Sequence, residues 1–200
     1  AMVLRQELDT QGVWDYDAAV GDLKVARLLP ESETDQFTQA SLTLTGKLGG
    51  ATLTYTGSHL DRHYLQDLDY SLYSDYYISG SYVQAYYSCY ISYFDACVDP
   101  RMPVTGNERT KRWNHEVRVA TDSDQRLRWV VGMFYEKSSW DSDLEFHIPG
   151  IASFSHFDAN GIRIDGAAVE PPDIYFTTDV EKDTTEKALF GQLEYDFTDK

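Results

Sequence analysis

Alternating apolar and polar residues mark several segments of the chain as β-strands. In QASLTLTGKLGGATLTYTGSH, leucines and a tyrosine recur at every second position, and threonines and serines fill most positions between them. A period of two places the two kinds of residue on opposite faces of a strand. The glycines at 49–50 can adopt the backbone angles of a tight turn. The segment predicts a hairpin in which Leu44 faces Leu53 and Leu42 faces Tyr55.

The same alternation recurs farther along the chain. RWNHEVRVATDSDQRLRWVVGMFYEK predicts a second hairpin around DSDQ, and TEKALFGQLEYDFTDK predicts half of a third. Aromatic residues lie toward both ends of the apolar face, and the opposite face is polar or charged. The strands are expected near residues 35–46, 51–62, 111–121, 125–138 and 184–198.

Two long segments, 63–110 and 139–183, separate the predicted strand pairs. Structureless loops beyond about 12 to 15 residues are uncommon in compact domains. Short turns at one end and long loops at the other are typical of outer-membrane barrels. The predicted strands also reach the roughly 9 to 11 residues that a tilted membrane strand needs. We expect an all-β, antiparallel up-and-down meander that is a segment of a transmembrane barrel with two long extracellular loops.

A soluble β-sandwich is the alternative architecture, because one buried face also produces alternation. Strands in soluble sheets are usually shorter, with a mode of about 5 to 6 residues, so the pattern favours the barrel. The alternative function is that of a soluble exported carbohydrate-binding β-domain. Whether the isolated chain is soluble without detergent distinguishes the two hypotheses.

The amino-acid composition limits the classes of partner that the protein is expected to bind. The formal net charge is −16 and the pI is about 4.5. These values argue against nucleic acid and against an anionic membrane surface as partner. No run of 18 apolar residues exists to form a transmembrane helix, and no signal-peptide pattern opens the chain.

The strand sequences resemble the barrel of TonB-dependent outer-membrane receptors. Phrases of the kind L-T-Y-x-G-S-x-x-D-R and G-x-F-Y occur at Leu53 to Arg62 and at Gly132 to Tyr135. Further phrases of this family, x-x-E-x-R-x-x-S and x-x-F-G-Q-x-x-Y-x-x-T-D, have counterparts at His115 to Thr121 and at Leu189 to Asp199. The resemblance covers all five predicted strands.

The resemblance implies a 22-stranded barrel closed by an N-terminal plug domain, in the outer membrane of a Gram-negative bacterium. Such receptors import a ferric siderophore, cobalamin or an oligosaccharide, powered by TonB through the plug. We expect a ferric siderophore, and neither enzymatic activity nor a cofactor. The sequence shows no candidate plug, and residues 198–200 read as a turn toward a further strand. We therefore expect an internal fragment of the barrel domain.

A tyrosine-rich segment is the main candidate for ligand binding. Ten tyrosines lie between Tyr64 and Tyr93, and no lysine or arginine occurs from Tyr64 to Pro100. Tyrosine combines a flat apolar ring with a polar tip, which suits stacking on sugars or catechols; packing within the loop is the alternative. Phenylalanines of IPGIASFSHFDANGIRIDG, which is expected to hold a short hairpin, are further candidates. The candidate ligand-binding residues are Tyr73, Tyr76, Tyr77, Tyr82, Tyr86, Tyr87, Tyr90, Phe154 and Phe157.

Cys89 and Cys97 lie close together in the tyrosine-rich segment. A disulfide between them would stiffen the loop; two free thiols are the alternative.

Other polar residues give weaker indications. The acidic runs Asp67, Asp69, Asp75 and Asp141, Asp143, Glu145 could offer oxygen ligands to Ca²⁺, but solvated acidic loops are commoner and no metal site is predicted. The residues expected to face the lumen, where cross-strand pairing is the favoured interpretation, are Glu116, Arg118, Arg126 and Arg128.

Overall fold

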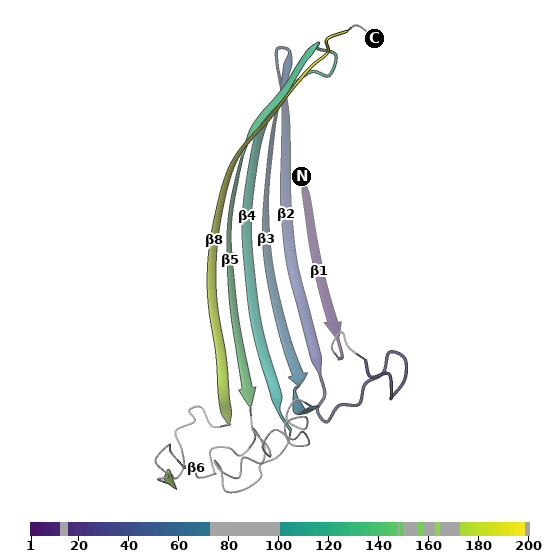
Figure 1. Cartoon of the computed structure of the whole chain (residues 1–200), viewed down its shortest axis with the longest axis vertical. Helices are drawn as coiled ribbons and strands as arrows, with labels where there is room; N and C mark the ends of the chain where they lie inside the picture. The colour runs from purple at the N-terminus through teal and green to yellow at the C-terminus, as the bar shows by residue number, and fades with distance from the viewer. Residues whose placement is uncertain are drawn as a thin grey trace.

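The main body of the protein is one antiparallel sheet. The computed structural model describes residues 1–12, 16–72, 101–147, 149, 156–157, 163–164 and 173–198. Six strands pair in the order β1-β2-β3-β4-β5-β8, each beside its predecessor along the chain (Figure 1). The predicted all-β up-and-down meander is confirmed. The strands are β1 (Met2–Thr10), β2 (Ser32–Leu48), β3 (Ala51–Asp69), β4 (Pro103–Thr121), β5 (Leu127–His147) and β8 (Ile174–Tyr195).

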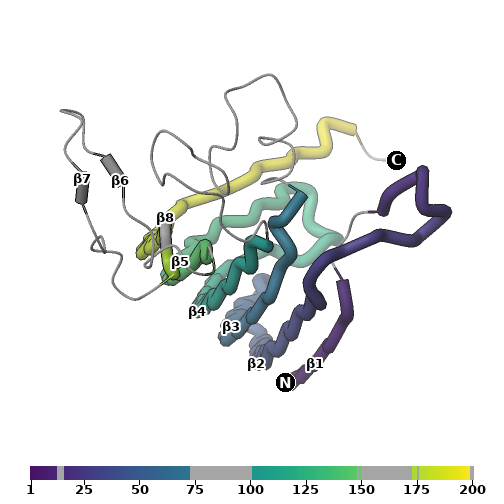
Figure 2. The backbone as a smooth tube through the Cα atoms, turned by 90° about the horizontal axis from the view of Figure 1, so that it is seen from below, coloured from purple at the N-terminus to yellow at the C-terminus, as the bar shows by residue number. Residues whose placement is uncertain are grey.

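The sheet is tall, bowed and open. Tight turns at 49–50 and 122–126 join strands at one end, and the longer connections lie at the other end (Figure 1). Seen from below, the strands follow one another in a single curved layer (Figure 2). β1 and β8 form its two edges, and the described strands do not close into a ring.

The sheet has six strands where the sequence predicted five. The missed strand is β1, and the predicted ones are longer than expected. β3 continues to Asp69, β4 begins at Pro103, β5 continues to His147 and β8 begins at Ile174, so strand residues occupy parts of the predicted loops 63–110 and 139–183. In these extensions both faces carry polar residues. The extensions of β3 and β4 therefore lack the apolar alternation that marks a half-buried strand. In β5 the alternation continues, but Trp140, Leu144 and Phe146 lie on the face opposite to that of the earlier apolar residues.

The register of the first hairpin corrects the predicted pairing. Leu44 pairs with Tyr55, and Leu42 pairs with Gly57. The turn consists of 49–50, where Gly49 has a φ of 61°, whereas the prediction centred the turn one residue earlier. The shift is two residues on the partner strand, so each side chain keeps its predicted face.

Two other predicted features are present. The second hairpin turns around residues 122–126, where the Thr121 hydroxyl accepts a hydrogen bond of 3.0 Å from the Trp129 backbone amide. Within the segment 148–166, β6 (His156–Phe157) pairs with β7 (Arg163–Ile164), which confirms the short hairpin expected there.

A hydrophobic core is almost missing from the described residues. Only Met102 and Val104 are buried hydrophobic residues there, at the end of the sheet with the long connections. The described elements include no helix long and apolar enough to cross a membrane. The apolar residues of the strands must therefore lie on a surface of the sheet.

Candidate functional site

One face of the sheet is apolar over the half nearest the tight turns. The register aligns Leu44, Tyr55, Val117, Met133 and Leu189 in one row across β2, β3, β4, β5 and β8. Neighbouring rows have the same character, and we call this surface the apolar face. Its residues are Leu42, Leu44, Leu48, Leu53, Tyr55, Trp113, Val117, Val119, Leu127, Trp129, Val131, Met133, Tyr135, Leu189, Leu193 and Tyr195.

Much of the apolar face is exposed. The exposed fraction is 56% for Met133, 70% for Leu193 and 84% for Leu189. The element pairs that make extensive contacts are all neighbours within a sheet. Single exposed apolar residues are ordinary, but a contiguous apolar surface of this kind marks an interaction site.

The apolar face ends at a defined height on the strands. On β5 it runs from Leu127 to Tyr135, which is about 26 Å at roughly 3.3 Å per residue. Beyond Tyr135, the same side of β5 carries Lys137, Ser139 and Asp141. The surface therefore changes from apolar to charged part-way up the strand.

The opposite side of the same rows, which we call the polar face, carries side-chain hydrogen bonds between neighbouring strands. The Ser58 hydroxyl donates to the Asn114 side-chain oxygen at 3.0 Å, and the hydroxyls of Thr43 and Thr56 lie 3.4 Å apart. These pairs link neighbouring strands and satisfy polar groups in the absence of a core.

The predicted charged residues of this region also pair with one another. Arg118 lies 3.6 Å from Glu116 on the same strand. Arg128 reaches across to β8, with nitrogens 2.6 Å from Asp196 and 3.4 Å from Glu194. The Arg126 side chain donates to the Asp196 carbonyl at 3.2 Å. Cross-strand contacts are therefore present for Arg126 and Arg128, whereas Glu116 and Arg118 pair along one strand, contrary to the expected cross-strand pairing.

Phe190 on β8 covers Gly132 on β5, its partner in the register. A Cβ atom built at Gly132 would collide with the Phe190 ring and would lie 2.8 Å from the Val117 carbonyl oxygen. An aromatic ring over a strand glycine fills the space that the missing side chain leaves open.

Aromatic and histidine rings gather where the apolar face ends toward the long connections. The rings of His59 and Trp113 stack with centroids 3.8 Å apart. The Tyr55 hydroxyl lies 2.9 Å from His115 Nδ1. Gly57 is buried between them, and its lack of a Cβ leaves room for the Tyr55 hydroxyl.

A buried polar cluster clamps the β1–β2 connection to the end of β3. The Asp69 carboxylate accepts hydrogen bonds from the backbone amides of Leu28 at 2.6 Å and Leu29 at 3.0 Å. The Asp69 amide donates to the Glu31 carboxylate at 3.1 Å, and the Ser71 amide donates back to Asp69 at 3.0 Å. We call these residues the Asp69 clamp.

The pKa of Asp69 reflects this environment. Burial raises it, but the hydrogen bonds from Ser71, Leu29 and Leu28 outweigh burial and leave the pKa below its ordinary value of 3.8. Asp69 is therefore ionised at neutral pH, and its carboxylate oxygens already accept hydrogen bonds from backbone amides. This corrects the suggestion from the sequence that Asp69 could bind Ca²⁺.

The first tyrosines of the tyrosine-rich segment have structural roles. Burial and a hydrogen bond with Glu33 raise the pKa of Tyr64 to about 12. The Tyr70 ring makes an edge contact with Phe146, with centroids 5.6 Å apart, and Phe146 contacts Phe176 in the same way at 5.5 Å. Tyr64 and Tyr70 therefore contact neighbouring parts of the sheet, as the alternative of packing predicts.

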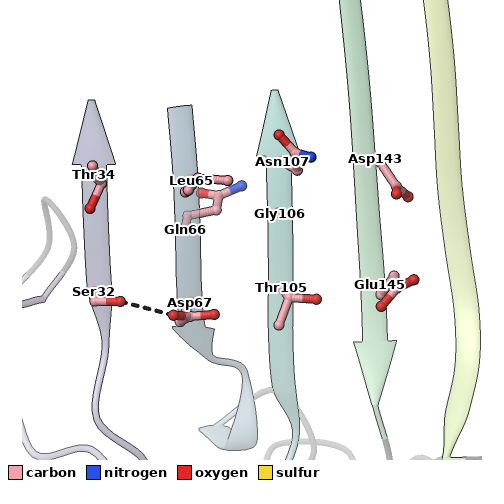
Figure 3. A pocket seen from close by; sticks show the side chains of 10 residues that line it. All are labelled: Ser32, Thr34, Leu65, Gln66, Asp67, Thr105, Gly106, Asn107, Asp143 and Glu145. Carbon is pink, nitrogen blue, oxygen red and sulfur yellow. Dashed lines mark hydrogen bonds between the residues drawn. The ribbon is translucent and has the colours of Figure 1, made fainter. Parts of the chain in front are cut away.

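An open hollow of about 380 Å³ lies beside the clamp, on the charged end of the apolar side (Figure 3). Side chains from β2, β3, β4 and β5 line it, and the Ser32 hydroxyl donates to Asp67 at 2.9 Å across its floor. Carboxylates enter it from two strands separated by β4. The hollow is polar and continues the charged part of the surface.

The second acidic run does not form a metal site. Asp141, Asp143 and Glu145 point to one side of β5, as alternate residues of a strand do. Alternate side chains lie about 6.6 Å apart along an extended strand, too far for one ion to gather all three. The described residues contain no cluster of three metal-ligating side chains. Asp75 lies outside the described residues.

Most predicted ligand-binding residues cannot be placed. Phe157 belongs to β6, of which the structure describes the backbone. Outside the described residues lie Tyr73, Tyr76, Tyr77, Tyr82, Tyr86, Tyr87, Tyr90, Phe154, Cys89 and Cys97. The ligand-binding and disulfide predictions for these residues stay predictions.

The Asp69 clamp was not predicted from the sequence. Asp69 and Leu28 are 41 positions apart, and a carboxylate that accepts backbone amides follows no periodic pattern. Comparisons with known proteins add no relative, because no family model, curated protein or solved structure matches the chain.

Proposed function

We propose that this sheet is part of the wall of a 22-stranded outer-membrane barrel, in a TonB-dependent receptor that binds and imports a scarce nutrient. On this proposal the apolar face contacts lipid and the polar face lines the barrel interior. The long connections recognise the ligand outside the cell. Binding and gating move the ligand without covalent chemistry, and TonB supplies energy through a plug domain.

The observation that carries the proposal is the exposed apolar face of a single-layered sheet. A soluble sheet would need a second layer over these residues, and the described elements provide none. In lipid the same exposure is favourable, because the surroundings are as apolar as the side chains. The polar face suits a water-filled interior.

The dimensions support the same assignment. The apolar face covers the nine residues from Leu127 to Tyr135 on β5, which agrees with the roughly 9 to 11 residues that a tilted membrane strand needs. Trp129 lies near one edge of the face and Trp113 at the other. Aromatic residues at both edges are typical of the two membrane interfaces. The sequence resemblance to TonB-dependent receptors points to the same class.

Tryptophan quenching tests the membrane contact directly. Variants that retain only Trp113, Trp129 or Trp140 are reconstituted into bilayers, and brominated lipids serve as quenchers. Trp113 and Trp129 should be quenched strongly. Trp140 is the control because it points to the polar face and donates to Glu108 at 3.3 Å, so it should be quenched weakly.

The opposite result would support the alternative that the chain is a soluble β-domain. A chain that unfolds cooperatively as a soluble monomer without detergent, and whose tryptophans escape quenching, contradicts the membrane proposal. Binding of an oligosaccharide by that soluble monomer would then favour a carbohydrate-binding domain.

For the ligand we propose a ferric siderophore, with cobalamin and an oligosaccharide as the other classes. Replacing Tyr76, Tyr77, Tyr86 and Tyr87 together with alanine should weaken ligand binding at least tenfold, because tyrosines commonly dominate contact energies. Equilibrium binding to each ligand class measures this. Tyr135→Ala, on the apolar face, is the control and should leave affinity unchanged. Unchanged affinity in the fourfold variant would assign the segment to packing.

A further inference from the structure

We propose that the edge of the apolar face toward the long connections binds the phosphate groups of anionic lipid headgroups, through Lys111, Lys137 and Lys187. This inference rests on the proposed membrane function and adds a lipid preference to one leaflet. We call the three residues the lysine line.

The lysine line follows the edge of the apolar face strand by strand. On β4, β5 and β8 the last apolar residues of that face are Trp113, Tyr135 and Leu189. Each is followed, two residues farther from the tight turns, by a lysine on the same side: Lys111, Lys137 and Lys187.

The register places the three lysines on one slanted line. Lys137 pairs with Trp113 and Lys187 pairs with Tyr135. The edge therefore moves two residues toward the turns at each step from β4 to β5 and from β5 to β8. Diagonal neighbours of this kind lie about 7 to 8 Å apart, so adjacent headgroup phosphates can bridge the lysines.

All three lysines are exposed, and none forms an ion pair with a carboxylate among the described residues, although Asp61 is the register partner of Lys111. Asp141 and Asp183 are diagonal neighbours of Lys111 and Lys137. The polar face differs. There Arg62 lies 2.8 Å from Asp35, Arg112 lies 3.6 Å from Glu136, and Arg128 contacts Asp196. Asp61, the register partner of Lys111, forms its ion pair with Arg109 at 3.1 Å and also attracts Lys111 electrostatically.

The other edge of the apolar face has no equivalent. Toward the tight turns, the apolar side continues to Thr121 on β4 and to Tyr195 on β8. At that end Lys47 and Arg128 lie on the polar face and pair with Asp122 and Asp196, and Arg126 donates to the Asp196 carbonyl. Within the described part of the chain, a line of lysines without ion pairs therefore marks only the edge of the apolar face toward the long connections.

Local charge decides the interaction despite the net charge of −16. At physiological salt the screening length is about 8 Å, so a headgroup at the lysine line is screened from the acids near the hollow. A lysine stem can lie along apolar surface while its ammonium reaches the interface. Each lysine near an anionic leaflet contributes roughly a fivefold preference.

Energy transfer from tryptophan tests the preference. In bilayers that contain labelled phosphatidylglycerol or labelled phosphatidylcholine, a chain with Trp113 alone should transfer more efficiently to phosphatidylglycerol. A chain with Trp129 alone, at the other edge, should show no preference. Salt near 0.5 M should reduce the Trp113 preference through screening.

Substitution identifies the residues. Lys111→Gln, Lys137→Gln and Lys187→Gln combined should abolish the preference at Trp113. Lys137→Gln alone should reduce it several-fold. Lys182→Gln is the matched control, because Lys182 is an exposed lysine on the polar face of β8, and it should leave the preference intact.

The outcomes separate this inference from the proposed function. Quenching of both tryptophans by brominated lipid with equal transfer to the two headgroups overturns the lipid preference and leaves the barrel wall standing. A preference that survives the triple substitution also overturns it. Absence of quenching at both tryptophans removes both proposals.

Discussion

At Gly132 the sheet has no room for a side chain. The Val117 carbonyl lies on one side and the Phe190 ring covers the other. Gly46 on β2 offers a contrast, because nothing lies within 4 Å of the position its Cβ would occupy. Gly132 and Gly46 therefore differ in whether the sheet has room for a side chain at their position.

Gly132→Ala should destabilise the protein by about 1 to 3 kcal/mol, as overpacking does. Gly46→Ala should change the free energy of unfolding by less than about 0.5 kcal/mol. Urea unfolding in detergent micelles measures both variants. Equal effects at the two positions would mean that Phe190 and the backbone near Val117 adjust freely.

The Asp69 clamp should be sensitive to acid. Because the folded-state pKa lies below 3.8, the stabilisation is complete above the unfolded value and is lost as the pH falls through the folded one. Amide exchange at Leu28 and Leu29, corrected for intrinsic rates, should therefore accelerate only at pH values below about 4.

Asp69→Asn should produce the same loss at neutral pH, because hydrogen bonds to a charged group are worth about 1.5 to 3 kcal/mol each. Protection of the Leu28 and Leu29 amides should fall at least tenfold. Asp67→Asn is the control, since Asp67 is exposed and bonds to the Ser32 hydroxyl. Unchanged protection in Asp69→Asn would show that other contacts hold the connection.

At the scale of elements, the β5–β8 pair carries facing acids near the long connections. Asp143 pairs with Asp179, and Asp141 pairs with Glu181. Like charges directly opposite each other destabilise a strand pair. This part of the sheet is therefore less stable than its hydrogen-bond ladder suggests.

Asp179→Lys should stabilise the pair by about 0.5 kcal/mol, more at low salt, by turning a repulsion into an ion pair with Asp143. Asp183→Lys makes the same change in charge opposite the neutral Ser139 and serves as the control. Unfolding in micelles at two salt concentrations compares them. Equal increases in stability in the two variants would show that the change in net charge, and not an ion pair with Asp143, causes the effect.

The sequence predicted those elements whose apolar residues alternate without interruption. Leu127 to Tyr135 marks β5 clearly. In β1, Met2, Leu4 and Leu8 share one face, but Gln6 interrupts them and the strand was missed. The extensions of β3 and β4 carry no apolar period, and in β5 the apolar residues change face at Trp140, so these extensions emerge only from the pairing in three dimensions.

The candidate site was predictable to a similar extent. The apolar face follows from the alternation, because side chains of a strand alternate strictly. The lysine line depends on the register between strands, which a single sequence does not specify. Asp69 and its backbone partners belong to contacts between distant segments, for which no local pattern exists.

At the scale of the whole molecule, the sheet has two unpaired edges. The outer edges of β1 and β8 carry backbone groups without a strand partner in the described part of the chain. In lipid such groups need another strand, because no water can satisfy them.

Hydrogen exchange of the chain in micelles should reveal these edges. The amides of β3 and β4, paired on both sides, should exchange slowly, and about half of those in β1 and β8 should exchange quickly. Mass spectrometry of proteolytic fragments provides the comparison. Uniform protection of β8 would show that a further strand, such as one from a second copy, pairs with its edge.

The slanted edge of the apolar face has a geometric consequence for any ring that includes this sheet. A step of two residues, about 6.6 Å, between strands about 4.8 Å apart corresponds to a lean of roughly 50° from the membrane normal. For a fixed number of strands, a greater lean widens the ring. On the proposed barrel assignment, the slant of the lysine line therefore bears on the diameter of the ring.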